Sequence, residues 1–165
     1  MSHQGSDFLI EAVMNSIEAS AGKIVIKCTV LPDSVSFDVE DDGDGIKCGD
    51  VFGEGVSTKG NGRGRGLYLL KKTALEAAVM SNGEGTCLSM RLAKEDLGLL
   101  SDVLPIIFTH ADDGVAVTFT MRRGNEVFTL DSDELKKEFG VLSRVSSIAE
   151  IRKRSSQADE LIKES

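Results

Sequence analysis

Three short stretches of the chain combine residue types that could do chemistry, and the first is "EDDGDGI", residues 40–46. It places acidic side chains around two glycines, directly after an apolar, alternating segment. In a calcium-binding loop that begins at Asp38, the twelfth position must be a bidentate glutamate, but it is Gly49. The calcium interpretation therefore fails. A tight surface turn and a ligand-binding carboxylate at the end of a strand remain as alternatives.

The second stretch is a polar stripe on the first predicted helix, residues 7–19. Glu11, Asn15 and Glu18 are spaced i, i+4 and i+7, which puts their side chains on one face of the helix. Because the helix is apolar at most other positions, this stripe must face either water or a cleft. The predicted apolar face consists of Leu9, Ile10, Val13 and Ile17.

The third stretch is "GNGRGRGLYLLKK", residues 60–72, in which alternate glycines lead into a predicted helix. It matches neither the Walker A loop nor the dinucleotide-binding glycine fingerprint. Exposed N–H groups of the glycines and the helix N-terminus would form an anion site. Lys59, Arg63 and Arg65 would strengthen that site. A flexible basic linker is the alternative.

Taken in order, these stretches resemble the ATP-binding motifs of the GHKL superfamily, which includes gyrase, the heat-shock chaperones, histidine kinases and the mismatch-repair MutL proteins. The segment "LIEAVMNSIEASAGKIVI" is similar to the MutL form of the first motif, whereas the glycine stretch is closer to that of histidine kinases. The matching motifs are Glu11-x-x-x-Asn15, Asp41-x-Gly43-x-Gly45, Gly62-x-Gly64-x-Gly66-Leu67 and Gly85-Thr86.

The resemblance implies binding of ATP with Mg²⁺ and a role for each motif. Asp41 would accept a hydrogen bond from the adenine amino group, Gly45 would let the base lie against the backbone, and Thr86 would fix Asp41 and a water. Asn15 would hold Mg²⁺, and Glu11 would orient or deprotonate the attacking nucleophile. Residues 56–66 would form a short lid over the phosphates. The other implied nucleotide-binding residues are Gly43, Lys59, Gly60, Asn61, Gly62, Arg63, Gly64, Arg65, Gly66 and Leu67.

Residues 97–140 also resemble the C-terminal part of small stand-alone ATP-binding proteins of anaerobic bacteria, often encoded among iron-only hydrogenase genes. The resemblance leaves three activities open: a protein kinase acting on a separate protein, a slow ATPase that gates a partner, and a nucleotide-sensing, anti-sigma-like module with negligible turnover. His3 lies in the leader and His110 in a predicted loop, so neither is expected to be a phosphoacceptor. A protein partner is expected to complete any catalysis.

The elements that must position these residues follow from periodicity and turn chemistry. They predict a two-layer α/β sandwich, a mixed and mostly antiparallel sheet with helices on one face. We expect a leader at 1–5, an ATP-binding core at 6–92 and an extension of the same domain at 93–165. Strands are predicted at 23–30, 34–40, 76–81, 86–92, 115–121 and 126–130, a glycine-rich loop at 46–61, and further helices at 65–74, 95–108, 131–139 and in the tail.

The C-terminal tail carries a narrow apolar seam at helical spacing. This seam is predicted either to pack against the chain's own sheet or to form a weak homodimer contact. Its members are Ile148, Ile151, Ser155, Ala158 and Ile162.

Composition limits the remaining function classes. The 165 residues carry a formal net charge of -8, which disfavours a nucleic-acid face because phosphate neutralisation needs excess Lys and Arg. No apolar run approaches the length of a membrane span, so no membrane partner and a cytoplasmic location are expected. Cys28, Cys48 and Cys87 include no C-x-x-C pair, which predicts reduced thiols rather than disulfides or a zinc site.

Overall fold

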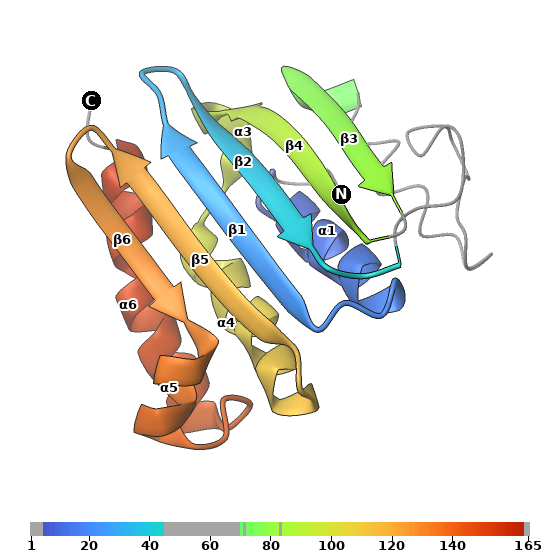
Figure 1. Cartoon of the computed structure of the whole chain (residues 1–165). Helices are drawn as coiled ribbons and strands as arrows, with labels where there is room; N and C mark the ends of the chain where they lie inside the picture. Colours follow the sequence, from blue (N-terminus) through green and yellow to red (C-terminus); the bar gives the residue numbers. More distant parts are fainter. Residues whose placement is uncertain (1–4, 45–69, 71, 83, 164–165) are drawn as a thin grey trace.

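The computed structural model describes residues 5–44, 70, 72–82 and 84–163. Within them the chain forms a six-stranded sheet in the order β3-β4-β2-β1-β5-β6, with its helices on one face (Figure 1). Neighbouring strands are antiparallel except β1 and β5, which are parallel. The predicted two-layer sandwich with a mixed, mostly antiparallel sheet is confirmed. The strands are β1 (Lys23–Val30), β2 (Ser34–Asp41), β3 (Glu76–Asn82), β4 (Gly85–Ala93), β5 (Ala116–Arg123) and β6 (Glu126–Asp131).

The helical layer lies behind the sheet in Figure 1. α4 packs between α1 on one side and α6 on the other. None of the helices among the described residues is both long and apolar enough to cross a membrane. The helices are α1 (Asp7–Glu18), α3 (Lys94–Leu97), α4 (Leu100–Thr109), the 3-10 helix η1 (His110–Asp113), α5 (Ser132–Phe139) and α6 (Val145–Lys163).

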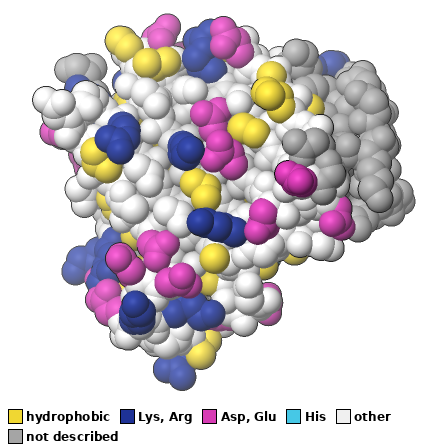
Figure 2. Space-filling view, in the orientation of Figure 1, with side chains coloured by type: hydrophobic (Ala, Val, Ile, Leu, Met, Phe, Trp, Pro, Cys, Tyr) yellow, Lys and Arg dark blue, Asp and Glu magenta, His cyan; other side chains and the backbone are white. Residues whose placement is uncertain are grey.

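Alternation along the strands separates a dry face from an open one. On each of β1 and β2, every second side chain faces the helices, and these side chains form the core with α1 and α4. The opposite face carries many charged side chains, which Figure 2 shows across the surface together with a few hydrophobic ones. One ion pair there joins Lys27 to Glu40 at 3.1 Å. The buried members on β1 and β2 are Ile24, Ile26, Cys28, Val30, Val35, Phe37 and Val39, as predicted.

The predicted helix at 95–108 is wrong in one respect, because it is two helices. Gly98 has φ 80° and Leu99 has an extended backbone, so α3 ends and α4 begins again at Leu100. The positive φ of Gly98 suits glycine and turns the chain by a sharp angle between the two helices. This break lets the side chain of Asp159 on α6 accept hydrogen bonds from the N–H groups of Leu100 and Ser101, at 2.7 and 3.2 Å.

The apolar face of α1 also differs from the prediction. Ile10 and Ile17 are half-buried and pack at the edge of the core, whereas the fully buried stripe is turned toward the sheet. A polar residue, Ser16, is part of that stripe, with 4% of its surface exposed. The buried residues of α1 are Phe8, Leu9, Ala12, Val13 and Ser16.

The C-terminal seam is buried within the chain, where α6 packs along α4. Four of its members are buried and Ile148 is half-buried. The alternative that the seam forms a homodimer contact is therefore wrong. The predicted loop at 46–61 lies outside the described residues, as does most of the predicted helix at 65–74.

Candidate functional site

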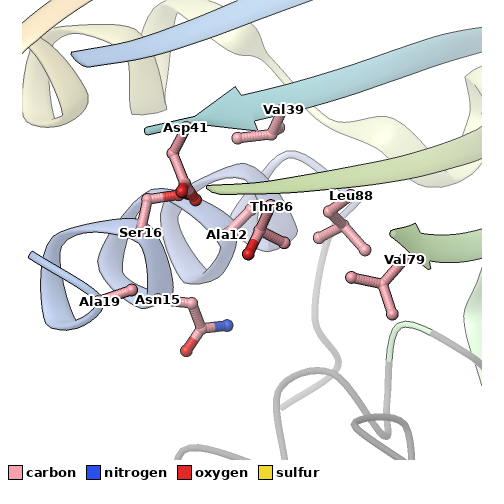
Figure 3. Close-up of a pocket in the computed structure, with 9 residues that line it drawn as sticks. All are labelled: Ala12, Asn15, Ser16, Ala19, Val39, Asp41, Val79, Thr86 and Leu88. Atoms are coloured by element: carbon pink, nitrogen blue, oxygen red, sulfur yellow. Dashed lines mark hydrogen bonds between the residues drawn. The ribbon is translucent and has the colours of Figure 1, made fainter. Parts of the chain in front are cut away.

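A cavity lies between the last turns of α1 and the ends of β2, β3 and β4 (Figure 3). Its walls are mostly aliphatic, and its polar groups come from α1, β2 and β4. Apolar walls with a few convergent polar groups are typical of sites that bind small molecules or cofactors. The lining residues are Ala12, Asn15, Ser16, Ala19, Val39, Asp41, Val79, Thr86 and Leu88.

The carboxylate of Asp41 is held from two sides. The hydroxyl of Ser16 donates to Oδ2 at 2.6 Å, and the N–H of Gly43 donates to Oδ1 at 2.9 Å. Each oxygen accepts one bond from the chain and keeps acceptor capacity toward the cavity. Asp41 was predicted from the sequence, but Ser16 was not. The sequence signal available for Ser16 was its spacing, because a residue four positions after Ala12 lies on the same, buried side of α1.

Two predicted glycines allow close backbone approaches, Gly43 to Ala19 and Gly85 to Asp41. A Cβ on Gly43 would come within 2.5 Å of the carbonyl oxygen of Ala19, and a Cβ on Gly85 within 2.2 Å of the carbonyl oxygen of Asp41. The N–H of Asp44 donates to the same Ala19 oxygen at 2.7 Å. Both glycines therefore join the end of α1, the end of β2 and the start of β4 into one compact wall.

The other acidic side chains of the "EDDGDGI" stretch point to separate partners. Asp42 accepts hydrogen bonds from the N–H groups of Gly22 and Lys23 at 2.8 and 3.0 Å. The N–H of Lys23, and then that of Gly22, lower the pKa of the Asp42 carboxyl below its usual range. Glu40 pairs with Lys27 on the open face of the sheet. Asp41 is thus the member of this stretch that lines the cavity.

Thr86 lies directly opposite Asp41 in the ladder between β2 and β4. Its hydroxyl lines the cavity and is 3.0 Å from the hydroxyl of Ser81. The expected contact in which Thr86 fixes Asp41 is therefore made by a different hydroxyl, that of Ser16. Thr86 remains a polar group on the sheet side of the cavity, the same side as Asp41 (Figure 3).

Glu11 and Asn15 lie one turn apart on α1, as their spacing predicts. Glu11 Oε2 and Asn15 Nδ2 are buried, and neither atom has a hydrogen-bond partner. Asn15 lines the cavity, and in Figure 3 its carboxamide points away from Asp41. Buried polar atoms without partners are rare in folded proteins, and each needs an explanation such as a missing ligand.

An amide oxygen beside a carboxylate suits Mg²⁺, which prefers oxygen donors and is usually bound through one or two protein groups together with phosphate oxygens. The side-chain oxygens of Asn15 and Glu11 are of the type that this donor set requires. Of the two buried atoms without a partner, Glu11 Oε2 and Asn15 Nδ2, only the Glu11 oxygen is a metal donor. In the part of the chain that the structure describes, no group of three or more His, Cys, Asp or Glu side chains is placed to hold a metal ion. The predicted residues Gly45, Lys59, Gly60, Asn61, Gly62, Arg63, Gly64, Arg65, Gly66 and Leu67 lie outside the described residues.

Comparisons with known proteins identify the family and the fold. Residues 6–96 match the family model of the histidine kinase-, DNA gyrase B-, and HSP90-like ATPases. No curated protein matches the chain. The fold is similar to the N-terminal domain of a DNA repair protein, with a TM-score of 0.57 and 16% identity over 76% of this chain and 51% of that one. It is also similar to the MutL ATPase domain of Aquifex aeolicus in complex with ADP, with a TM-score of 0.50 and 16% identity over 93% of this chain and 70% of that one. The chain thus spans about half the length of the DNA repair domain.

Proposed function

We propose that this chain, which belongs to the family of histidine kinase-, DNA gyrase B-, and HSP90-like ATPases, binds ATP and ADP in the cavity beside Asp41. The observation that carries the proposal is the fixed carboxylate of Asp41 at one end of an apolar cavity, with unsatisfied polar atoms of Glu11 and Asn15 on the adjoining helix. A base at one end and phosphates at the other would use both sets of groups. The ADP complex of the similar MutL domain supports the same ligand class.

Asp41 would select adenine through its amino group. A carboxylate is an acceptor, so it pairs with the 6-amino group of adenine and repels the 6-carbonyl of guanine. Val39, Val79 and Leu88 would contact the faces and edges of the ring. A site built to accept a hydrogen bond rejects an analogue that lacks the donor far more strongly than an apolar pocket could.

Asn15 and Glu11 would serve the phosphate end of the nucleotide. Asn15 would hold Mg²⁺ through its side-chain oxygen, and the ion would supply charge neutralisation at the phosphates. Glu11, one turn earlier on α1, would orient the attacking nucleophile or accept its proton. The burial of Glu11 Oε2 without a partner supports this role, since that oxygen is free to accept a hydrogen bond from a nucleophile.

The proposed activity is that of a histidine-kinase-like kinase or slow ATPase that acts on, or signals to, a partner protein in the cytoplasm. A nucleotide-sensing module with negligible turnover is the second candidate. The observation that favours the sensing module is that three polar residues of the cavity would contact the base and not the phosphates. These are Ser16, Asp41 and Thr86, and nucleotide binding without hydrolysis would be enough to complete their hydrogen bonds.

We further propose that residues 6–92 form the nucleotide-binding core and 93–165 an extension of the same domain, after a leader at 1–5. Two contacts support a single unit. β5 extends the sheet by pairing in parallel with β1. The N–H groups of Gly5 and Ser6 donate to the carbonyl oxygens of Asp96 and Leu97 at 2.6 and 2.7 Å. Gly5, the last residue of the proposed leader, and Ser6, the first residue of the core, are therefore both bonded to the extension.

Incubation with ATP labelled on the γ-phosphate tests the proposal and separates its branches. Labelled protein partner indicates a kinase, labelled free phosphate indicates an ATPase, and bound but unchanged ATP indicates a sensor. Calorimetry with ADP and ATP, with and without Mg²⁺, measures binding in parallel. Failure of the chain to bind either nucleotide would contradict the proposal as a whole.

A further inference from the structure

Ser16, a buried serine in the last turn of α1, uses its hydroxyl differently from Ser155, a buried serine in the middle of α6. On α6, Ser155 donates to the carbonyl oxygen of Ile151 in its own helix, at 2.7 Å. This back-bond is the usual choice of a helical serine. The hydroxyl of Ser16 instead crosses to another element and donates to Asp41 Oδ2 at 2.6 Å. A bond of this length to a carboxylate is a strong, charge-assisted one.

This bond fixes both the carboxylate and the polarity of the part of the cavity beside Asp41. A hydroxyl has one proton, so the proton that Ser16 gives to Asp41 is not available to a ligand. The Ser16 oxygen therefore presents an acceptor to the cavity, as do the free lone pairs of Asp41. With the Gly43 N–H on Oδ1 and the Ser16 hydroxyl on Oδ2, rotation of the carboxylate would break one bond or the other.

We propose that Ser16 is a positioning residue that sets the selectivity of this site for 6-aminopurine over 6-oxopurine nucleotides. The inference rests on the proposed function, because it assigns a role within the same nucleotide site. The oxygens of Asp41 and Ser16 present only hydrogen-bond acceptors, and the carboxylate is held in one plane. They therefore favour a ligand edge that donates a hydrogen bond, as the 6-amino group does. The same oxygens disfavour a 6-carbonyl oxygen, which would meet the carboxylate as a second acceptor.

The chain offers a matched control on the other face of β2. There the hydroxyl of Ser89 donates to Asp38 Oδ1, also at 2.6 Å. The two serine–aspartate pairs have the same chemistry and length, and both join β2 to a neighbouring element. Asp38 and Asp41 differ in parity along β2, so the Ser89 pair lies on the face away from the cavity. Ser89→Ala removes an equivalent bond without touching the proposed site.

The test measures the affinities of the full chain for ADP and for inosine diphosphate by calorimetry. Inosine diphosphate differs from ADP at the 6-position, where a carbonyl replaces the amino group, and in the protonation of N1 that follows. We expect Ser16→Ala to weaken ADP binding about tenfold and to change inosine diphosphate binding by less than about twofold. The ratio of the affinity for ADP to the affinity for inosine diphosphate should then fall about tenfold. Ser89→Ala should leave both affinities and their ratio unchanged.

Ser16→Thr restores the hydroxyl and should restore the ratio of the two affinities, because the bulk of the added methyl group acts on both nucleotides alike. If Ser16→Ala does not fold, Ser16→Cys, with a weaker donor of similar size, should show a smaller narrowing of the same sign. Equal weakening of both nucleotides, or no weakening, would overturn the role of Ser16 while the proposed function stands. A wild-type chain that binds neither nucleotide would overturn both.

Discussion

The helices α1 and α6 both pack on the inner side of the molecule and both bury polar side chains, but they differ in how these are satisfied. On α6, the hydroxyl of Ser155 bonds to its own helix and the carboxylate of Asp159 accepts two N–H groups of α4. On α1, Glu11 Oε2 and Asn15 Nδ2 are buried without partners. Buried polar side chains thus have their hydrogen-bond partners on α6, whereas two buried polar atoms on α1 have none.

We interpret this difference as a division between residues that hold the fold and residues whose partner is the proposed ligand. A buried polar group that is bonded stabilises modestly, whereas one left without a partner costs about 1–3 kcal/mol. Proteins tend to retain such unfavourable groups at functional sites, where a ligand can supply the partner. Substitutions on α6 should therefore lower the free energy of unfolding, and substitutions of Glu11 or Asn15 should change activity instead.

The largest effect is expected from deleting residues 146–165. This deletion uncovers the apolar side of α4 and removes the carboxylate that caps its first turn. We expect loss of cooperative folding rather than a change in oligomeric state. Circular dichroism with thermal unfolding measures this, and light scattering reports the mass. A folded truncation that binds ADP like the full chain would contradict the division between the helices.

Glu11→Gln should give the next largest effect, on turnover. If Glu11 meets the nucleophile, γ-phosphate release or transfer should fall by about 100-fold or more, while nucleotide affinity stays within about tenfold. The free energy of unfolding should not fall, because the Glu11 oxygen that is lost has no partner. Glu18→Gln, on the same helix, is the charge-matched control. Retained turnover in Glu11→Gln would remove the general-base role.

Asp159→Ala should lower the free energy of unfolding by about 2–3 kcal/mol, since it leaves two buried N–H groups at the start of α4 without their charged acceptor. The nucleotide affinity of the folded protein should be unchanged. Urea denaturation and calorimetry with ADP measure the two quantities on the same preparation. A loss of ADP affinity with unchanged stability would reverse the assignment of α6 to structure.

Much of the sheet and part of this contrast could be predicted from the sequence, because they depend on local pattern. The alternation of β1 and β2 identified their buried side chains. The acidic sequence at 131–139 predicted the helix α5, which Asp131 caps by accepting a bond from the Glu134 N–H at 3.2 Å. The spacing of Glu11 and Asn15 placed them together on one helix face without any tertiary information.

The features that the sequence could not supply depend on contacts between distant residues. The bond from Ser16 to Asp41 spans 25 positions, and a serine within a helical pattern carries no sign of its partner. Gly98 could have been tolerated inside a helix at a cost of about 1 kcal/mol, so its role as a break appears only with the φ that packing imposes. The same holds for Asp159, whose acceptor role depends on that break.

Asp41→Asn should weaken ADP and ATP binding alike, by about 1–3 kcal/mol, because both nucleotides share the base and lose a charge-assisted hydrogen bond. Asp41 resembles Asp159 in holding donors from the chain with both oxygens, yet it also lines a cavity. Asp38→Asn, in the matched pair on the open face, should leave both affinities unchanged. Calorimetry in which Asp41→Asn keeps full ADP affinity would move Asp41 to the structural class.

Asn15→Ala should give the smallest effect on stability and the sharpest contrast with Asp159→Ala. Removing a buried carboxamide nitrogen that has no partner relieves its desolvation cost, while shortening the side chain loses some packing. We expect the free energy of unfolding to stay within about 1 kcal/mol of the wild type, in either direction. The dependence of ATP affinity on Mg²⁺ should disappear, because the side-chain oxygen proposed to hold the ion is gone. Urea denaturation measures the stability of this variant, and calorimetry in Mg²⁺ and in a chelator measures the Mg²⁺ dependence of ATP binding. A stability loss comparable to that of Asp159→Ala, with the Mg²⁺ dependence intact, would place Asn15 among the residues that hold the fold.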